Sequence, residues 1–307
     1  METCVDLFCG AGGFSCGFKD DKTRFIGIDS DPIKLETYAH NIGGETIKTD
    51  IMELDPSVLP KSVHKLIGSP PCQSHSNANR FATHDHSLIQ KYVDLRDDLR
   101  PTWWVMEEVP GAAYVCDEAG RRIIKDWEIR FLKASDFGLP HLRNRLFAGN
   151  YPNPVKHPYK GEFWVSTDGK HKTRYIPTPM TGGIQAFGYE RERGYPNVEK
   201  LKAMIKTPVA QIRGYGHGKD DRSDILARAI GLIGDGSAVD AESMRFCDII
   251  TPRFVAKIMG FPDDYVFSGT KDEQFVQIGN AVCPPVAHAI YLAIESGVPA
   301  KTQTTFF

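Results

Sequence analysis

The sequence has seven cysteines but no pair of them in C-x-x-C spacing. Such pairs are typical of zinc sites, and an even, regularly spaced set is typical of a disulfide framework. Because neither pattern is present, we predict no metal site and no disulfide scaffold. Free thiols favour a reducing compartment, so we expect a cytoplasmic protein.

Long apolar runs are also missing. No stretch approaches 18 consecutive apolar residues, so we expect no membrane contact. The sequence begins without a basic segment ahead of an apolar one, so we expect no secretory signal. Internal repeats and low-complexity tracts are absent as well. A hydrophobic share of 41% and a charged share of 25% are ordinary for a globular protein.

The net charge is −2, which gives little indication of a polyanionic partner until it is divided along the chain. Residues 141–230 hold 16 Lys and Arg against 8 Asp and Glu, whereas the rest holds 21 against 31. A basic face in this region could neutralise phosphates. The alternative is a solvated loop region that is rich in lysine.

The first 150 residues alternate between strand-like and helix-like segments. Helices are predicted from Pro32 to about Asn41 and over 87–99, and a helix start over 14–20. The predicted strands are 4–8, 24–29, 46–49, 63–68, 103–106, 131–134 and 145–148. This alternation predicts an α/β fold with a doubly wound, mostly parallel sheet.

The chain changes character after residue 150. Residues 151–244 are rich in proline, glycine and charge, with weak apolar periodicity, which indicates a smaller module. Helices are then predicted over 252–259 and from about Pro285 to Ile294, and they could return the chain to the first domain. We therefore expect domains at 1–150 and 151–244 and a C-terminal segment at 245–307.

Polar motifs stand where the predicted strands end. A glycine-rich turn follows the first strand within residues 6–13, and Asp29 and Asp50 follow the next two. Ligands of doubly wound sheets bind at the carboxyl ends of the strands. The turn could bring its backbone close to a ligand. Asp29 could accept hydrogen bonds from a ribose diol, and Asp50 could accept one from an adenine amino group. The alternatives are a simple strand-to-helix turn and two helix caps.

Cys72 follows two prolines at another strand end. The prolines stiffen the approach, and four polar residues follow, which favours a reactive thiolate over a buried structural cysteine. Glu107 and Glu108 end a further strand. Because adjacent strand residues face opposite ways, only one of them should point into a given site. A glutamate with a raised pKa could protonate a ring nitrogen.

The segment 141–145 alternates, so that His141, Arg143 and Arg145 could share one face. Arginines there could hold a base carbonyl, a carboxylate or a phosphate. Surface salt bridging is the alternative for these residues and for the glutamates.

Together these motifs resemble the cytosine-5 DNA methyltransferases, in the family's order and approximate spacing. The matching segments are DLFCGAGG (6–13), GIDSDP (27–32), TD (49–50), GSPPCQ (68–73), EEV (107–109), DFGLPHLRNRLF (136–147), TPRFVAKIMGFPDDY (251–265) and QIGNAVCPPVAHAI (277–290). The segment 151–244 falls where the family has its variable target-recognition region.

The resemblance implies a Rossmann-like methyltransferase that uses S-adenosylmethionine. It implies that Cys72 adds to carbon 6 of cytosine, that Glu107 contacts the ring nitrogen and the amino group, and that Arg143 and Arg145 hold the base and the nucleophile loop. The cofactor-binding residues that it implies are Asp6, Phe8, Gly10, Gly12, Asp29, Asp50, Pro71 and Asn280.

The substrate that the resemblance implies is double-stranded DNA, whose target base must leave the stack to be reached. Residues 74–87 are expected to form a loop that closes over it. The resemblance also implies a role in restriction–modification or phage self-protection. The compact length, without an extra regulatory domain, favours a prokaryotic or phage-encoded enzyme. Because an asymmetric reaction on one base needs no symmetric partner, we expect a monomer.

Several positions depart from the family pattern. Glu108 stands where the family usually has Asn, His141 where it has Gln, and His75-Ser76 where it often has Phe-Ser. A carboxylate at 108 should raise the pKa of Glu107. Two other hypotheses therefore stay open: a family member that acts on RNA or a modified pyrimidine, and a DNA-binding relative without turnover.

Overall fold

The computed structural model describes residues 1–71, 86–117, 119–125, 128–160 and 252–297. It also describes four two-residue strands, which form the pairs β8 (Phe163–Trp164) with β9 (Lys172–Thr173) and β10 (Pro179–Met180) with β11 (Gly183–Ile184). Most of the expected target-recognition module, 151–244, lies outside the described residues. The domain boundaries at 150 and 244 therefore stay predictions.

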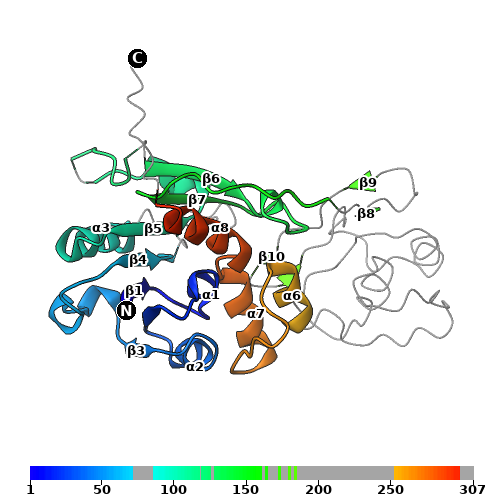
Figure 1. Cartoon of the computed structure of the whole chain (residues 1–307), viewed down its shortest axis with the longest axis horizontal. Helices are drawn as coiled ribbons and strands as arrows, with labels where there is room; N and C mark the ends of the chain where they lie inside the picture. The colour runs from blue at the N-terminus through cyan, green and yellow to red at the C-terminus, as the bar shows by residue number, and fades with distance from the viewer. Residues whose placement is uncertain are drawn as a thin grey trace, which may run out of the picture.

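A seven-stranded sheet in the order β3-β2-β1-β4-β5-β7-β6 forms the centre of the described structure (Figure 1). The first five strands in this order are parallel, and β7 is antiparallel to both β5 and β6. The predicted doubly wound, mostly parallel sheet is confirmed. The strands are β1 (Glu2–Leu7), β2 (Thr23–Asp29), β3 (Glu45–Lys48), β4 (Lys65–Gly68), β5 (Trp103–Glu108), β6 (Ile129–Lys133) and β7 (Asn144–Gly149).

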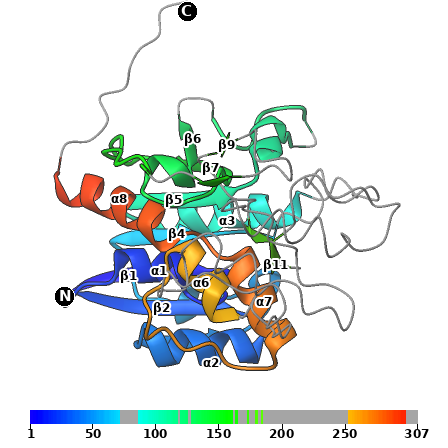
Figure 2. The same cartoon turned by 90° about the vertical axis from the view of Figure 1, so that its right-hand side faces the viewer.

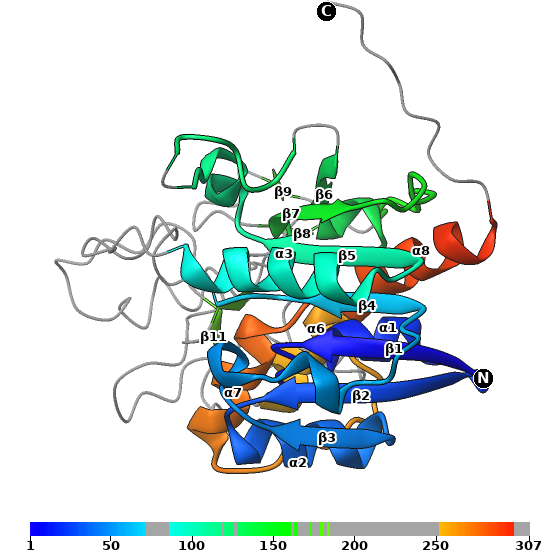
Figure 3. The same cartoon turned by 90° about the vertical axis from the view of Figure 1, so that its left-hand side faces the viewer.

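One face of the sheet is covered by five helices and the other by α3 together with short 3-10 turns (Figure 3). The two faces have separate apolar clusters because side chains alternate across each strand. The first face carries α1 (Gly13–Phe18), α2 (Pro32–Asn41), α6 (Pro252–Met259), α7 (Lys271–Asn280) and α8 (Pro284–Glu295). The second carries α3 (Ser87–Leu99), η1 (Ile51–Glu53), η2 (Pro56–Val58) and η3 (Pro110–Tyr114). A further 3-10 turn, η5 (Ala134–Asp136), follows β6.

The C-terminal helices pack on the first part of the chain. α8 lies against α1, and α6 and α7 lie side by side (Figure 2). The contact between α1 and α8 depends on Gly17, where a Cβ would lie 2.5 Å from the backbone oxygen of Pro284 and 2.6 Å from the backbone nitrogen of His288. The sequence segment after 251 therefore shares its core with the first 150 residues.

Helix α7 was not among the predicted helices. Its apolar residues are few, but Thr270 and Glu273 form a capping box, in which each side chain bonds the backbone N–H of the other. This Thr-x-x-Glu pattern was the available sequence signal. The helix matters for the site because its last residue is Asn280. In the described ranges, no helix has the length and apolar character needed to cross a bilayer.

Candidate active site

A cavity of about 500 Å³ lies where β1, β2, β4 and β5 end. Its position is the point at which the sheet order reverses between β1 and β4, where doubly wound folds bind their ligands. The segments after these strands line it, together with Arg143, Arg145 and the end of α7. Nine of the twelve predicted site residues line this cavity, whereas Asp6 and Gly12 lie outside its lining and Cys72 lies outside the described residues.

The turn after β1 forms one wall of the cavity. Phe8, Gly10 and Gly12 all have positive φ, at 58°, 51° and 79°. Phe8 and Gly10 line the cavity, whereas Gly12 caps α1 from behind, where a Cβ would approach Ile42 and the Tyr265 hydroxyl to 2.9 Å. Glycine adopts such conformations freely, so the turn can present its bare backbone to a ligand.

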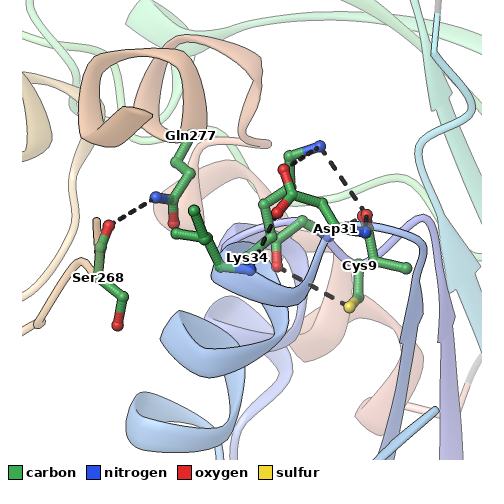
Figure 4. A network of polar contacts seen from close by, with 8 residues as sticks. Cys9, Asp31, Lys34, Ser268 and Gln277 are labelled. Atoms are coloured by element: carbon green, nitrogen blue, oxygen red, sulfur yellow. Dashed lines mark hydrogen bonds and ion pairs between the residues drawn. The ribbon is translucent and has the colours of Figure 1, made fainter. Parts of the chain in front are cut away.

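Asp29 fixes this turn to the end of β2. Its Oδ2 accepts a hydrogen bond from the Gly10 backbone N–H at 3.0 Å, and its Oδ1 accepts one from the Asp31 N–H at 2.9 Å. The Lys34 ammonium lies 3.8 Å from the Asp29 carboxylate and 3.6 Å from the Asp31 carboxylate (Figure 4). Asp29 lines the cavity, whereas Asp31 caps α2 through the Ile33 N–H. An ionised carboxylate can accept further bonds, so Asp29 remains a candidate acceptor for ligand hydroxyls.

Asp50 caps a short helix, which is one of the two roles considered for it, and it also lines the cavity. Its Oδ1 accepts from the Met52 N–H at 2.9 Å and so caps η1, and the residue is exposed in the cavity wall. Apolar side chains of Phe8, Ile51 and Phe14 lie in the same wall. Carboxylates beside apolar surfaces suit a nucleoside, whose ring needs apolar contact and whose hydroxyl and amino groups donate.

Asp6 lies beneath the turn and does not line the cavity. It is fully buried, and its Oδ2 accepts from the Ser15 hydroxyl at 2.6 Å, which also bonds the Tyr38 hydroxyl at 2.9 Å. Burial raises the pKa of Asp6 to about 7, although the Ser15 bond acts in the opposite direction. Asp6 can therefore support the glycine-rich turn only from below.

The two glutamates at the end of β5 face opposite sides of the sheet, as predicted. Glu107 lines the cavity, and Glu108 does not. The Glu107 Oε1 forms an ion pair with Arg145 Nε at 3.2 Å but has no aligned hydrogen-bond donor among the described residues. Burial raises the pKa of Glu107, and Arg145 and Arg143 act in the opposite direction. The protonated form of Glu107 is therefore more accessible than that of a solvent-exposed glutamate.

Arg143 and Arg145 approach the cavity from β7 and the segment before it. Arg143 is buried and donates to the backbone oxygens of Gly279 at 2.9 Å and Ala281 at 3.2 Å. These bonds fix both neighbours of Asn280, which lines the cavity. Arg145 instead stays partly exposed beside Glu107. The two arginines thus have different partners.

His141 does not share the arginines' position in the wall. It is fully buried, and its Nδ1 accepts from the Arg143 backbone N–H at 3.4 Å. Burial lowers the pKa of His141 to about 3, with Arg143 adding to the effect. The imidazole is therefore neutral and serves as a packed hydrogen-bond acceptor.

Lys34 and Gln277 are two of the cavity residues that the sequence reasoning missed. Lys34 lies in the first turn of α2, and Gln277 lies in α7, where its Nε2 donates to the Ser268 backbone oxygen at 2.9 Å (Figure 4). A lysine in the first helical turn after the strand-end acid was the available signal for Lys34. Gln277 required knowledge of α7.

Pro70 and Pro71 line the cavity at the end of β4. Cys72 lies outside the described residues. Among the described residues, no group of three His, Cys, Asp or Glu side chains is arranged to hold a metal ion.

The fold and the site define an α/β protein with a nucleoside-sized cavity. Asp29 and Asp50 line one end of this cavity, and Glu107 and the two arginines line the other. The C-5 cytosine-specific DNA methylase family matches residues 2–154 and 169–296 of the chain, so the chain belongs to this family. The resemblance is confirmed, and the protein is a DNA methyltransferase that uses S-adenosylmethionine to methylate cytosine.

Individual relatives agree with this assignment. The type II methyltransferase M.FnuDI of Fusobacterium nucleatum is 34% identical over 97% of this chain and 96% of its own length. The type II methyltransferase M1.HphI of Haemophilus parahaemolyticus is 28% identical over 95% and 86%. A crystal structure of a Spodoptera frugiperda DNMT2 mutant has a similar fold, with a TM-score of 0.59, 16% identity and coverage of 96% and 100%.

Proposed function

We propose that this enzyme methylates carbon 5 of a cytosine that has left the stack of duplex DNA, with Cys72 as covalent nucleophile. The observation that carries the proposal is the single cavity between the glycine turn and Glu107. A cofactor at one end and a base at the other would meet within it, which the transfer of one carbon between them requires.

The cofactor end fits S-adenosylmethionine by its chemistry. Asp29 and Asp50 offer acceptors to hydroxyl and amino groups, and Phe8 and Gly10 line the same cavity. Asn280, between the two residues that Arg143 fixes, would complete the site, and Asp6, Gly12 and Pro71 would support it. When bound, S-adenosylmethionine supplies an electrophilic methyl group.

The base end supplies the nucleophile and the acid. The Cys72 thiolate adds to carbon 6 of the cytosine, while Glu107 holds the ring nitrogen and the amino group and limits the charge that develops there. Carbon 5 becomes nucleophilic and would take the methyl group, with S-adenosylhomocysteine as the leaving group. A base then removes the proton of carbon 5, and the thiolate leaves as the ring double bond re-forms. Arg145 keeps Glu107 in position, and Arg143 fixes the wall beside it.

Duplex DNA is the proposed substrate because a recognition module is expected at 151–244, where positive charge is concentrated. The names of the type II relatives support a role in restriction–modification. A cytoplasmic monomer, prokaryotic or phage-encoded, fits a reaction that modifies one base on one strand at a time.

The test is methyl transfer from radiolabelled S-adenosylmethionine into unmethylated duplex DNA of mixed sequence, followed by nucleoside analysis. We expect 5-methylcytosine, and we expect the Cys72→Ser variant to lose more than about 10³-fold of the rate while cofactor binding persists. DNA that contains 5-fluorocytosine should trap the wild type covalently. Full activity of Cys72→Ser would exclude this mechanism, and incorporation into tRNA in a competition assay would instead favour an RNA substrate.

A further inference from the structure

The glycine-rich turn after β1 is supported by a side chain from the C-terminal part of the sequence. The Tyr265 hydroxyl donates a hydrogen bond to the Ala11 backbone oxygen at 2.5 Å, although the two residues are 254 positions apart. Ala11 lines the cavity, whereas Tyr265 does not. The Tyr265 hydroxyl can therefore act on a ligand in the cavity only through the turn.

The turn needs support because its backbone is strained. Phe8 has a φ of 58°, which is uncommon for a residue that carries a side chain. Conformations of this kind persist only where the surrounding structure holds them. Two hydrogen bonds of 3.0 Å tie the N–H groups of Cys9 and Gly10 to the end of β2. Tyr265 adds a support from the loop between α6 and α7.

The Tyr265 side chain is itself fixed by its surroundings. The residue is 4% exposed, and its ring packs on Phe261 and Phe267 with centroid separations of 4.7 and 5.2 Å. Burial raises the pKa of Tyr265, so its hydroxyl stays protonated and can donate. Gly12 leaves room for this hydroxyl, because a Cβ there would lie 2.9 Å from its oxygen.

The backbone of Tyr265 is held as well. Arg253, near the start of α6, donates to the backbone oxygen of Tyr265 at 2.5 Å and to that of Pro262 at 3.4 Å. The Tyr265 N–H donates to the same Pro262 oxygen at 3.1 Å. These bonds fix the loop between α6 and α7, so the position of the hydroxyl is set before a ligand enters the cavity.

We propose that Tyr265 is a positioning residue for S-adenosylmethionine, which keeps the glycine-rich turn in its binding conformation through the Ala11 carbonyl. The inference rests on the proposed role of this turn in cofactor binding. Without the hydroxyl, a smaller fraction of the enzyme has the turn in this conformation, and the apparent Kd rises by the same factor. Bound cofactor itself holds the turn in place, so the chemical step should be unaffected.

Tyr265→Phe tests the proposal because it removes one oxygen atom and keeps the ring. We expect the Kd for S-adenosylmethionine to rise about 3- to 10-fold in isothermal titration calorimetry with the full-length enzyme, since one neutral hydrogen bond is lost. KM for the cofactor should rise by a similar factor. At saturating cofactor, kcat should change by less than about twofold.

Tyr151→Phe is the matched control. Tyr151 is fully buried in the same apolar cluster, and its hydroxyl also donates to a backbone oxygen, that of Phe147, at 3.3 Å. Both variants should lose some thermal stability, whereas only Tyr265→Phe should lose cofactor affinity. A wild-type Kd in Tyr265→Phe, or an equal rise in Tyr151→Phe, would overturn the proposal. If Tyr265→Phe does not fold, Arg253→Met, which releases the Tyr265 backbone, takes its place with the same criteria.

Amide hydrogen exchange over residues 8–13 provides a second measurement that needs no turnover. Without cofactor, exchange should be faster in Tyr265→Phe than in the wild type, and Tyr151→Phe should match the wild type. Cofactor that binds the wild type without slowing this exchange would contradict the proposed cofactor site. Slowed exchange in the wild type, together with an unchanged Kd in Tyr265→Phe, would contradict the role of Tyr265 alone.

Discussion

At the scale of single residues, Asp29 and Asp31 are neighbouring carboxylates with different positions relative to the cavity. Both lie near Lys34, and both bond to backbone N–H groups, but only Asp29 lines the cavity. The pair therefore provides a variant and its matched control within three residues.

We expect Asp29→Asn to weaken binding of S-adenosylmethionine roughly 10- to 100-fold, because a hydrogen bond to a charged group contributes about 1.5–3 kcal/mol. Isothermal titration calorimetry measures this directly. Asp31→Asn should bind nearly as wild type, since asparagine also caps helices well. Equal losses in both variants would mean that the carboxylates act only on the fold.

At the scale of elements, the contact between α1 and α8 joins residues that are about 270 positions apart. The side chain of His288 also bonds the Gly17 backbone oxygen at 3.0 Å, and the Tyr291 hydroxyl donates to Asp20 at 2.6 Å. Gly17 permits this approach because it has no Cβ.

Gly17→Ala should lower the free energy of unfolding by about 1–3 kcal/mol or more, because backbone atoms rather than flexible side chains occupy the space that its Cβ needs. Denaturant unfolding measures the change. Gly43→Ala is the control: it has open space around it but a φ of +75°, so only about 1 kcal/mol of backbone strain is expected. A smaller loss at Gly17 than at Gly43 would show that the two helices can separate at little cost.

The sequence predicted most of the elements but not all of their relations. Strand-end motifs located the cavity because parallel strands must bring their ends to one edge, and α3 and α6 have the predicted bounds. The antiparallel direction of β7 was not predicted, because it depends on long-range strand pairing. Helix α7 was not predicted either, because its sequence signal is a capping box rather than apolar spacing. The bonds from Arg143 to Gly279 and Ala281 could not be predicted, because they also depend on long-range contacts.

At the scale of the whole molecule, buried titratable groups couple stability to pH. The pKa of His141 is lowered by burial to about 3, whereas in an unfolded chain it is near 6.5. Between these values the unfolded state binds more protons, so the contribution of His141 to stability is present above about pH 6.5 and is lost as the pH falls towards 3. Burial raises the pKa of Asp6 to about 7 and that of Glu108 to about 8. Below these pH values the folded state binds more protons than the unfolded state, so both groups lower the stability as the pH rises towards 8.

The difference between wild type and His141→Gln isolates the histidine. We expect wild type to lose stability relative to this variant progressively from about pH 6.5 to pH 4, as followed by thermal unfolding at each pH. His64→Gln serves as a comparison, because that imidazole is only partly buried. Parallel stability curves for wild type and His141→Gln would show that the imidazole is already charged in the folded protein.

The bonds from Arg143 to the carbonyls of Gly279 and Ala281 have a consequence for the synthesis of the protein. The two sides of the cavity wall are separated by 136 residues, so a growing chain that has already made its glycine turn, its strand-end acids and its cysteine still lacks one side of the cavity. At about 5–20 residues per second, the ribosome needs roughly 7 to 27 s to deliver the missing side. Interrupted chains that end inside this interval would carry Cys72, Glu107 and Arg143 but lack Asn280 and its neighbours, so their cavity would stay incomplete.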